Sequence, residues 1–375
     1  MKLKYFSLIL SFMLLSAWIK SASQSDAEIP ALKEVFANSF YIGTSLNMNQ
    51  IIGKDKKAVE LVEKHFNTIT AENIMKWEKI HPEPGKYNFE PVDSFVAFGR
   101  KNNMLIIGHT LLWHAQTPSW VFEDEDGKFV SRDTLLNRLK EHIMTVVGRY
   151  KGIIHGWDVV NEAIEDNGEF RKSKWYNIIG EDYIEKAFEF AHEADPNTEL
   201  YYNDYNMWHI GKLKKVIELV KSLKSKNIKI DGIGLQGHWG LEYPSNNEID
   251  FALSKYSELD VNLMITEHDV QVLPLPEKNI GADISKNYEL QKKYNPFPTE
   301  FPDSMQVKLG KRYEDFFTLF NKYKNKISRV TFWGVSDSDS WHNNWPIFGR
   351  KAYPLLFDRN YLPKPAFKYI IKTVN

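Results

Sequence analysis

Cysteine is absent from all 375 residues of this chain. Its absence excludes disulfide bonds, thiolate metal sites and a lipid-modified N-terminal cysteine. The chain also lacks an excess of positive or negative charge, because its formal net charge is only −1. A nucleic-acid-binding protein needs a basic surplus to meet the phosphates, so we expect no nucleic-acid partner. Beyond the N-terminus no segment reaches about 20 uninterrupted apolar residues, so we expect no membrane span in the mature chain.

The N-terminal stretch has three parts. Two lysines precede the apolar stretch Tyr5–Ile19, and small residues follow at positions 21 to 23. This layout is typical of a secretory signal. We therefore expect a signal peptide over residues 1–23 and a mature chain over residues 24–375 that is secreted or periplasmic. An uncleaved N-terminal anchor is the alternative.

The rest of the chain alternates between two patterns. Helical patterns have apolar residues at i, i+3, i+4 and i+7, as at Ile184, Ala187, Phe188 and Ala191. Between them lie apolar runs typical of buried strands. These runs are Tyr41–Leu46, Thr68–Ala71, Leu105–Leu112, Ile153–Val160, Leu200–Asn203, Ile230–Leu235, Val261–Thr266 and Val330–Val335.

Eight such alternations predict a single α/β domain, a closed (β/α)8 TIM barrel. About 350 mature residues suit one barrel of this kind. An open doubly wound sheet is the alternative, but no glycine-rich phosphate turn follows any of the runs. In a barrel the active site lies at the carboxyl ends of the strands.

Two glutamates stand at the far ends of apolar runs. Glu162 follows Ile153–Val160, and Glu267 follows Val261–Thr266. A buried charge costs desolvation, so either glutamate alone could be half of a structural ion pair. The two together favour a shared cleft. Paired carboxylates with separated pKa values are what cleavage of a glycosidic bond requires.

Other polar residues also follow the apolar runs, so seven strands are expected to contribute to one rim. These residues are Glu72, Asn73, His109, Asn161, Asn203, Asp204, Gln236, His238, Asp269 and Asp337.

At this point the chain resembles glycoside hydrolase family 10, the endo-β-1,4-xylanases. The resemblance covers Leu32 to Ile371 and is carried by Thr70–Trp77, Gly108–His114, Trp157–Ala163, Gly234–His238, Ile265–Glu267 and Trp333–Val335. It implies that Glu162 is the acid/base and Glu267 the nucleophile, with Asp269 and Tyr205 in support. It also implies that sugar is held by Glu72, Asn73, Lys76, His109, Trp113, Gln116, Asn161, Gln236, His238, Trp333 and Trp341.

The resemblance further implies a retaining hydrolase of xylan and xylo-oligosaccharides, and we expect a monomer. No cofactor is expected. Four histidines, His109, His114, His238 and His268, could suggest a metal site, but none shows the HExxH spacing, so we expect no metal.

The charge states of the two glutamates can be anticipated from their neighbours. Apolar and aromatic neighbours should raise the pKa of Glu162 toward the acid role. Strand alternation sends Glu267 and Asp269 the same way. We therefore expect Asp269 to orient His238, which donates to Glu267 and keeps it ionised. A satisfied core histidine is the alternative for His238. Lys76 could be a mere i+4 surface partner of Glu72, although the family pattern places its ammonium over sugar hydroxyls.

Three features depart from the family pattern. His268 follows the nucleophile where an apolar residue is usual, and alternation should point it away from the sugar. The connection Leu273–Ser304 is long. The segment Trp341–Trp345 lacks the basic residue often found just after that tryptophan.

Two rival functions remain open. An endoglucanase or mannanase could use the same barrel and the same two glutamates. A catalytically inactive xylan-binding protein could keep the scaffold alone.

Overall fold

The computed structural model describes residues 29–276 and 287–374. The signal peptide predicted for residues 1–23 lies outside this part of the chain. Among the described residues, no helix is both long and apolar enough to cross a membrane.

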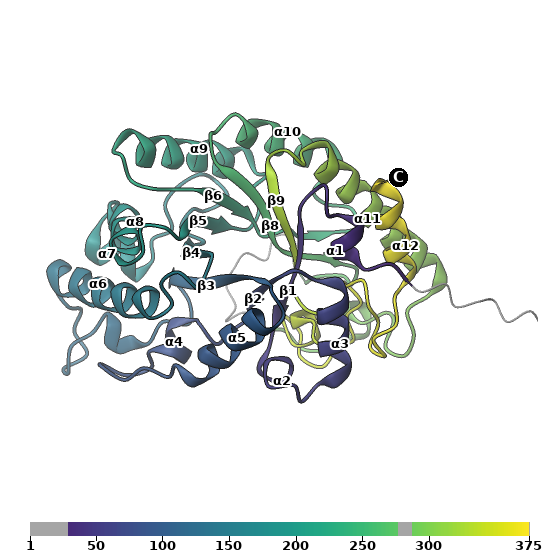
Figure 1. The fold of residues 1–375 in the computed structure, drawn as a ribbon, viewed down its shortest axis with the longest axis horizontal. Coiled ribbons are helices and arrows are strands. Elements are labelled where there is room, and N and C mark those ends of the chain that lie inside the picture. The colour runs from purple at the N-terminus through teal and green to yellow at the C-terminus, as the bar shows by residue number, and fades with distance from the viewer. Residues whose placement is uncertain (1–28, 277–286, 375) are drawn as a thin grey trace, which may run out of the picture. The chain divides into compact units, whose positions relative to one another are not determined.

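Eight parallel strands close into a barrel (Figure 1). Around it the order is β1, β2, β3, β4, β5, β6, β8 and β9, with β9 paired to β1 and β6 to β8. A short extra strand, β7, pairs with β8. The strands are β1 (Tyr41–Leu46), β2 (Thr68–Ala71), β3 (Leu105–Trp113), β4 (Gly156–Asn161), β5 (Glu199–Asp204), β6 (Gly232–Leu235), β7 (His238–Gly240), β8 (Asn262–Gln271) and β9 (Ile327–Phe332). The predicted (β/α)8 barrel is confirmed.

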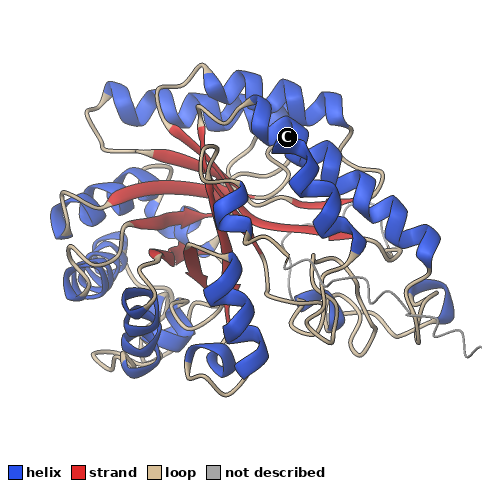
Figure 2. Cartoon of the chain, turned by 45° about the vertical axis from the view of Figure 1, so that its right-hand side comes forward, coloured by secondary structure: helices blue, strands red, loops and turns tan. Residues whose placement is uncertain are grey.

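Helices surround the strands, as Figure 2 shows. They are α1 (Leu32–Val35), α2 (Met48–Ile51), α3 (Lys56–His65), α4 (Trp77–Ile80), α5 (Glu90–Lys101), α6 (Arg132–Arg149), α7 (Lys174–Ile179), α8 (Tyr183–Ala194), α9 (Ile210–Ser225), α10 (Asn246–Ser257), α11 (Asp303–Lys322) and α12 (Pro365–Ile371). The apolar stripe Ile184, Ala187, Phe188 and Ala191 is buried on α8, as its spacing predicts. Ser245 and Glu248 form a capping box that fixes the start of α10.

Some strand boundaries differ from the prediction. Strand β4 begins at Gly156, so residues 153–155 precede it. Strand β9 ends at Phe332, because Gly334 takes a φ of 129° that a strand cannot hold. At β8 the strand continues past Thr266 to Gln271. The second half of β8 is polar, so its sequence does not show the apolar run of a buried strand. It nevertheless pairs with β7, and His238 lies opposite Asp269.

Two carboxylates expected on the rim are buried in ion pairs instead. Asp204 Oδ1 lies 2.9 Å from Lys212 Nζ on α9. Asp337 Oδ2 likewise lies 2.9 Å from Lys364 Nζ. Neither carboxylate lines the cleft at the strand ends. The prediction that Asp204 and Asp337 contribute to the rim is therefore wrong, because each is turned to a buried lysine that neutralises it.

The Asp204–Lys212 pair yields a stability prediction. Lys212→Met should lower the free energy of unfolding by about 3–5 kcal/mol, because it leaves the buried Asp204 charge without its paired cation. Denaturant unfolding measures this, with Lys214→Met, on the exposed face of the same helix, as the control. The control should stay within about 0.5 kcal/mol of the wild type. Equal losses in the two variants would contradict the buried pair.

Candidate active site

A cleft of about 870 Å³ opens at the carboxyl ends of the strands. It brings together all the residues for which a catalytic or sugar-holding role was predicted, and Tyr205 as well. These are Glu72, Asn73, Lys76, His109, Trp113, Gln116, Asn161, Glu162, Gln236, His238, Glu267, Trp333 and Trp341. Asp269 is fully buried behind them. The cleft thus gathers residues from many strand ends, as a barrel site requires.

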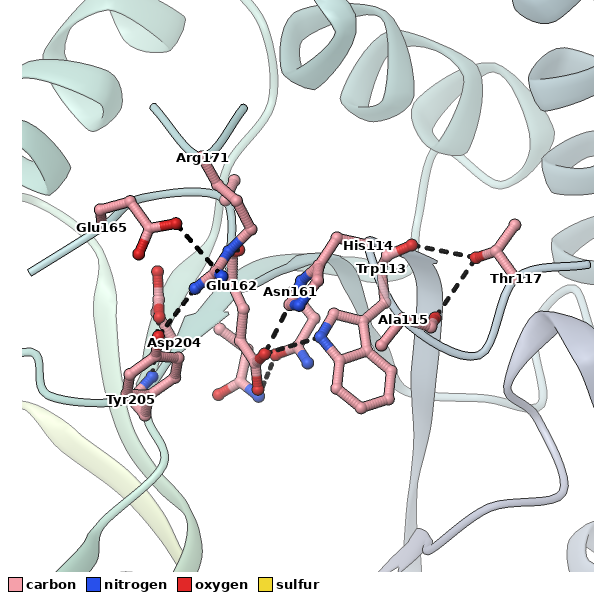
Figure 3. A network of polar contacts seen from close by, with 12 residues as sticks. Trp113, His114, Ala115, Thr117, Asn161, Glu162, Glu165, Arg171, Asp204 and Tyr205 are labelled. Atoms are coloured by element: carbon pink, nitrogen blue, oxygen red, sulfur yellow. Dashed lines mark hydrogen bonds and ion pairs between the residues drawn. The ribbon is translucent and has the colours of Figure 1, made fainter. Parts of the chain in front are cut away.

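Glu162 follows β4 and has a positive φ of 58°. Its carboxylate accepts a hydrogen bond from Trp113 Nε1 at 2.7 Å (Figure 3). It accepts a second from Gln236 Nε2 at 2.8 Å. Burial raises the pKa of Glu162 to about 7, and the charges of Asp204 and Glu267 add to this, while the two hydrogen bonds oppose it. This carboxyl therefore carries a proton up to neutral pH.

Arg171 supports Glu162 from outside the cleft. Its Nε donates to the Glu162 carbonyl at 2.9 Å, and its Nη2 donates to the Tyr205 hydroxyl at 2.7 Å (Figure 3). Glu165 pairs with the same guanidinium at 3.2 Å. Arg171 was not predicted, because it lies in a loop between β4 and α7 and follows no strand directly.

Glu267 lies on β8 in the opposite charge environment. Asn203 Nδ2 donates to its carboxylate at 2.7 Å, and His238 Nε2 lies 3.2 Å away. Burial alone would raise the pKa of Glu267. The His238 hydrogen bond, the charges of His109 and His238, and the Asn203 bond outweigh burial and hold the pKa below its usual range. This carboxylate therefore stays ionised.

Asp269 holds His238 in place. His238 Nδ1 lies 3.1 Å from Asp269 Oδ2, so the ring bridges Asp269 and Glu267. Burial would lower the pKa of His238, but the charge and hydrogen bond of Asp269, aided by Glu267, raise it to about 10. These contacts are the ones the sequence predicted, and they do not fit an isolated core histidine.

Asp269 also contacts two residues of the segment that follows β9. Trp341 Nε1 donates to it at 2.8 Å, and His342 Nε2 lies 3.3 Å from its other oxygen. Within the described chain, His238, Asp269 and His342 form the group whose ligand atoms are close enough for a metal, all within 4.8 Å. Asp269 holds this group together through an ion pair with His238 and a contact with His342.

A chain of amides joins the two glutamates. Asn161 lies within hydrogen-bond distance of Asn203, at 3.0 Å, and of Gln236, at 3.2 Å. Gln236 contacts Glu162 and Asn203 contacts Glu267, so the two carboxylates are held in one fixed frame.

Lys76 is a cleft residue and not a surface partner. Residues 72–76 form a turn and not a helix, so the i+4 geometry does not arise. Its Nζ donates to Asn73 Oδ1 at 2.9 Å and lies 4.9 Å from the centre of the Trp113 ring. Burial lowers the pKa of Lys76, and the charges of Glu267, Glu72 and Glu162 oppose this.

Two further expectations concern the surroundings of the cleft. His268 points away from it, as predicted, and packs against Tyr313, Phe316 and Phe320. Burial lowers the pKa of His268 to about 4, so the ring is neutral. The connection after β8 contributes Leu273, Pro274 and Leu275 to the cleft wall. Residues 277–286 of that connection lie outside the described part.

The other cleft-lining residues were not predicted, because all but Gln271 lie outside the strands. They are Asn206, Trp208, His209, Glu242, Tyr243, Gln271, Leu273, Pro274, Leu275, His342, Asn344 and Trp345. For Trp345 the sequence does offer a signal, because it lies four residues after Trp341. The two rings stack with their centres 4.6 Å apart.

The Asp269 contact can be tested by titration. Asp269→Asn should lower the pKa of His238, because it removes the largest influence that favours the imidazolium. NMR of labelled imidazole nitrogens measures the shift, with the exposed Asp260→Asn as control. A His238 that stays protonated to the same pH in Asp269→Asn would show that the aspartate does not set its charge.

Comparison with known proteins identifies the family. The model of glycosyl hydrolase family 10 matches residues 31–373. Endo-1,4-beta-xylanase A of Xylanibacter ruminicola is 46% identical over 343 residues, which are 92% of this chain and 93% of that protein. An endo-1,4-beta-xylanase of Geobacillus stearothermophilus is 43% identical and is covered over 99% of its length, against 92% of this chain.

Solved structures agree with these matches. A GH10 endoxylanase from a sugarcane soil metagenome has a TM-score of 0.88 and 43% identity, covering 91% of this chain and 99% of that one. A xylanase from Paenibacillus barcinonensis has a TM-score of 0.83 and 44% identity, covering 92% and 99%. On its sequence, its fold and the cleft at its strand ends, the chain belongs to glycosyl hydrolase family 10.

Proposed function

We propose that this protein is a secreted endo-1,4-β-xylanase that cleaves internal bonds of xylan with retention of configuration. The observation that carries the proposal is the opposite charge state of two buried glutamates in one cleft, with the pKa of Glu162 raised to about 7 and that of Glu267 lowered. The relatives named above, all called xylanases, support the choice of substrate.

In the first step Glu267 attacks the anomeric carbon and forms a bond to the sugar. The bond from that carbon to the leaving oxygen breaks, and the oxygen takes the proton of Glu162. Water then gives a proton to Glu162, and its oxygen bonds to the anomeric carbon as the bond to Glu267 breaks. Two inversions leave the configuration unchanged.

The neighbouring residues act on position and charge. His238, held by Asp269, keeps Glu267 ionised for attack. Asn161 is placed between the two carboxylates, where its amide can hold the sugar 2-hydroxyl and strengthen that contact in the transition state. Trp333 and Trp341 offer apolar faces to sugar rings, and Lys76 offers a donor. No step needs a cofactor or metal.

The remaining parts of the proposal rest on the sequence. The N-terminal signal pattern supports cleavage near residue 23 and export of a mature chain 24–375, either to the periplasm or to the medium. We also propose that the enzyme works as a monomer.

The substrate is tested by release of reducing sugar from xylan, cellulose and mannan. We expect activity on xylan that exceeds the other two, since the relatives named are xylanases. Activity on cellulose or mannan alone would favour the endoglucanase or mannanase alternative. Binding to xylan without any release would favour the inactive binding protein.

Stereochemistry tests the double displacement. NMR of the first-formed products, recorded before mutarotation, should show the β-anomer. An initial α-anomer would mean that water attacks directly and that Glu267 forms no bond to the sugar.

The roles of the two glutamates are separated by an aryl xyloside with an acidic phenol. Glu267→Ala should lose activity on it, because the nucleophile is gone. Glu162→Ala should give a burst and then slow turnover, because departure needs no acid but hydrolysis still needs a base. Azide should restore turnover and yield a β-glycosyl azide.

The exposed Glu169→Ala, a few residues from Glu162 in sequence, is the matched control and should behave as the wild type. A burst in Glu267→Ala and none in Glu162→Ala would reverse the two assignments.

A further inference from the structure

A second, shallower hollow adjoins the cleft at the N-terminal ends of α9 and α10. Its volume is about 450 Å³, and it is lined by Trp208, His209, Ile210, Asn247, Glu248 and Phe251. Trp208 and His209 also line the main cleft. These two residues therefore border both spaces.

The floor of this hollow is apolar and exposed. Ile210 is 52% exposed and Phe251 46% exposed, which is unusual for large apolar side chains so close together. Glu248 contributes a carboxylate that is used in the capping box of α10, and His209 lies 3.9 Å from Asp166. An apolar floor with a weakly acidic rim suits a neutral sugar better than an anionic one.

The segment that joins the two spaces is held firmly. Asn206 Nδ2 donates to Asp166 at 3.0 Å, and Lys212 Nζ lies 3.2 Å from the same carboxylate. On the other side the Tyr256 hydroxyl donates to the Met207 carbonyl at 2.9 Å. A surface fixed in this way loses little conformational entropy when a ligand binds.

The order of strands shows which end of the substrate would reach the hollow. Glu162 follows β4 and Glu267 lies on β8, so the two divide the barrel rim into two sectors. Lys76, His109 and Trp333 lie in the sector of β2, β3 and β9. If the sugar that becomes bonded to Glu267 occupies that sector, the leaving sugar enters the other one, above β5 and β6, where α9 and α10 begin.

We propose that Ile210 and Phe251, reached past Trp208, bind distal xylosyl residues on the leaving-group side of a neutral xylan chain. This inference rests on the proposed function. The hollow would favour long substrates, because a short oligosaccharide that fills the main cleft does not extend this far. It would place cleavage away from the reducing end of a chain.

The experiment compares kcat/KM for xylohexaose with kcat/KM for xylotriose. Phe251→Ala and Ile210→Ser should each lower this ratio by about three- to tenfold, the scale of one lost apolar contact. Phe251→Trp should keep the ratio, because it keeps a ring at the same place. Phe129→Ala removes another exposed phenylalanine, 62% exposed and outside both spaces, and should leave the ratio unchanged. Thermal unfolding checks that each variant is folded.

The possible results separate this inference from the function on which it rests. An unchanged ratio in folded Phe251→Ala and Ile210→Ser overturns the inference, while xylan hydrolysis by the wild type leaves the function standing. A wild type that releases no sugar from xylan overturns both. Light scattering compares the molar mass of these variants with that of the wild type. A lower molar mass in the variants, with an unchanged kcat/KM ratio, would show that this face joins two copies of the chain and would also overturn the inference.

Discussion

The contact chain from Asp269 through His238 to Glu267 is the interaction on which the site depends. Without it, burial would raise the pKa of both carboxyl groups in the cleft, because burial favours the neutral form. His238 lowers the pKa of Glu267, because its ring lies 3.2 Å from Glu267 and is held 3.1 Å from Asp269. At Glu162 burial is the largest influence, and it raises the pKa to about 7. The chemistry follows from this difference in surroundings.

The barrel supplies the geometry that this contact chain needs. The pairing of β7 with β8 places His238 opposite Asp269 in register, and β5 brings Asn203 to the other side of Glu267. Trp341 donates to the same Asp269 oxygen that faces His238, so one buried carboxylate orients both a sugar platform and the partner of the nucleophile. A change at Asp269 would therefore reach both at once.

The sequence predicts the barrel and the two glutamates because strand periodicity and strand-end charge are local signals. It fails where the deciding partner is distant. Asp204 and Asp337 look like Glu162 and Glu267 in the sequence, and only the positions of Lys212 and Lys364 show that they are structural. The second half of β8 was missed because its polar residues hide a strand that pairs with β7. Arg171 and Trp208 lie in loops and Phe251 lies on the exposed face of α10, where no periodicity marks a functional residue.

The most direct measurement is a titration of the two carboxyl carbons by NMR, in the protein with labelled glutamate and with Glu162→Gln and Glu267→Gln to assign the signals. The structure predicts that Glu162 titrates near a pKa of about 7 and that Glu267 titrates below the usual range for a glutamate. Ordinary pKa values for both, or a raised value at Glu267 with a low one at Glu162, would contradict the assignment of acid and nucleophile.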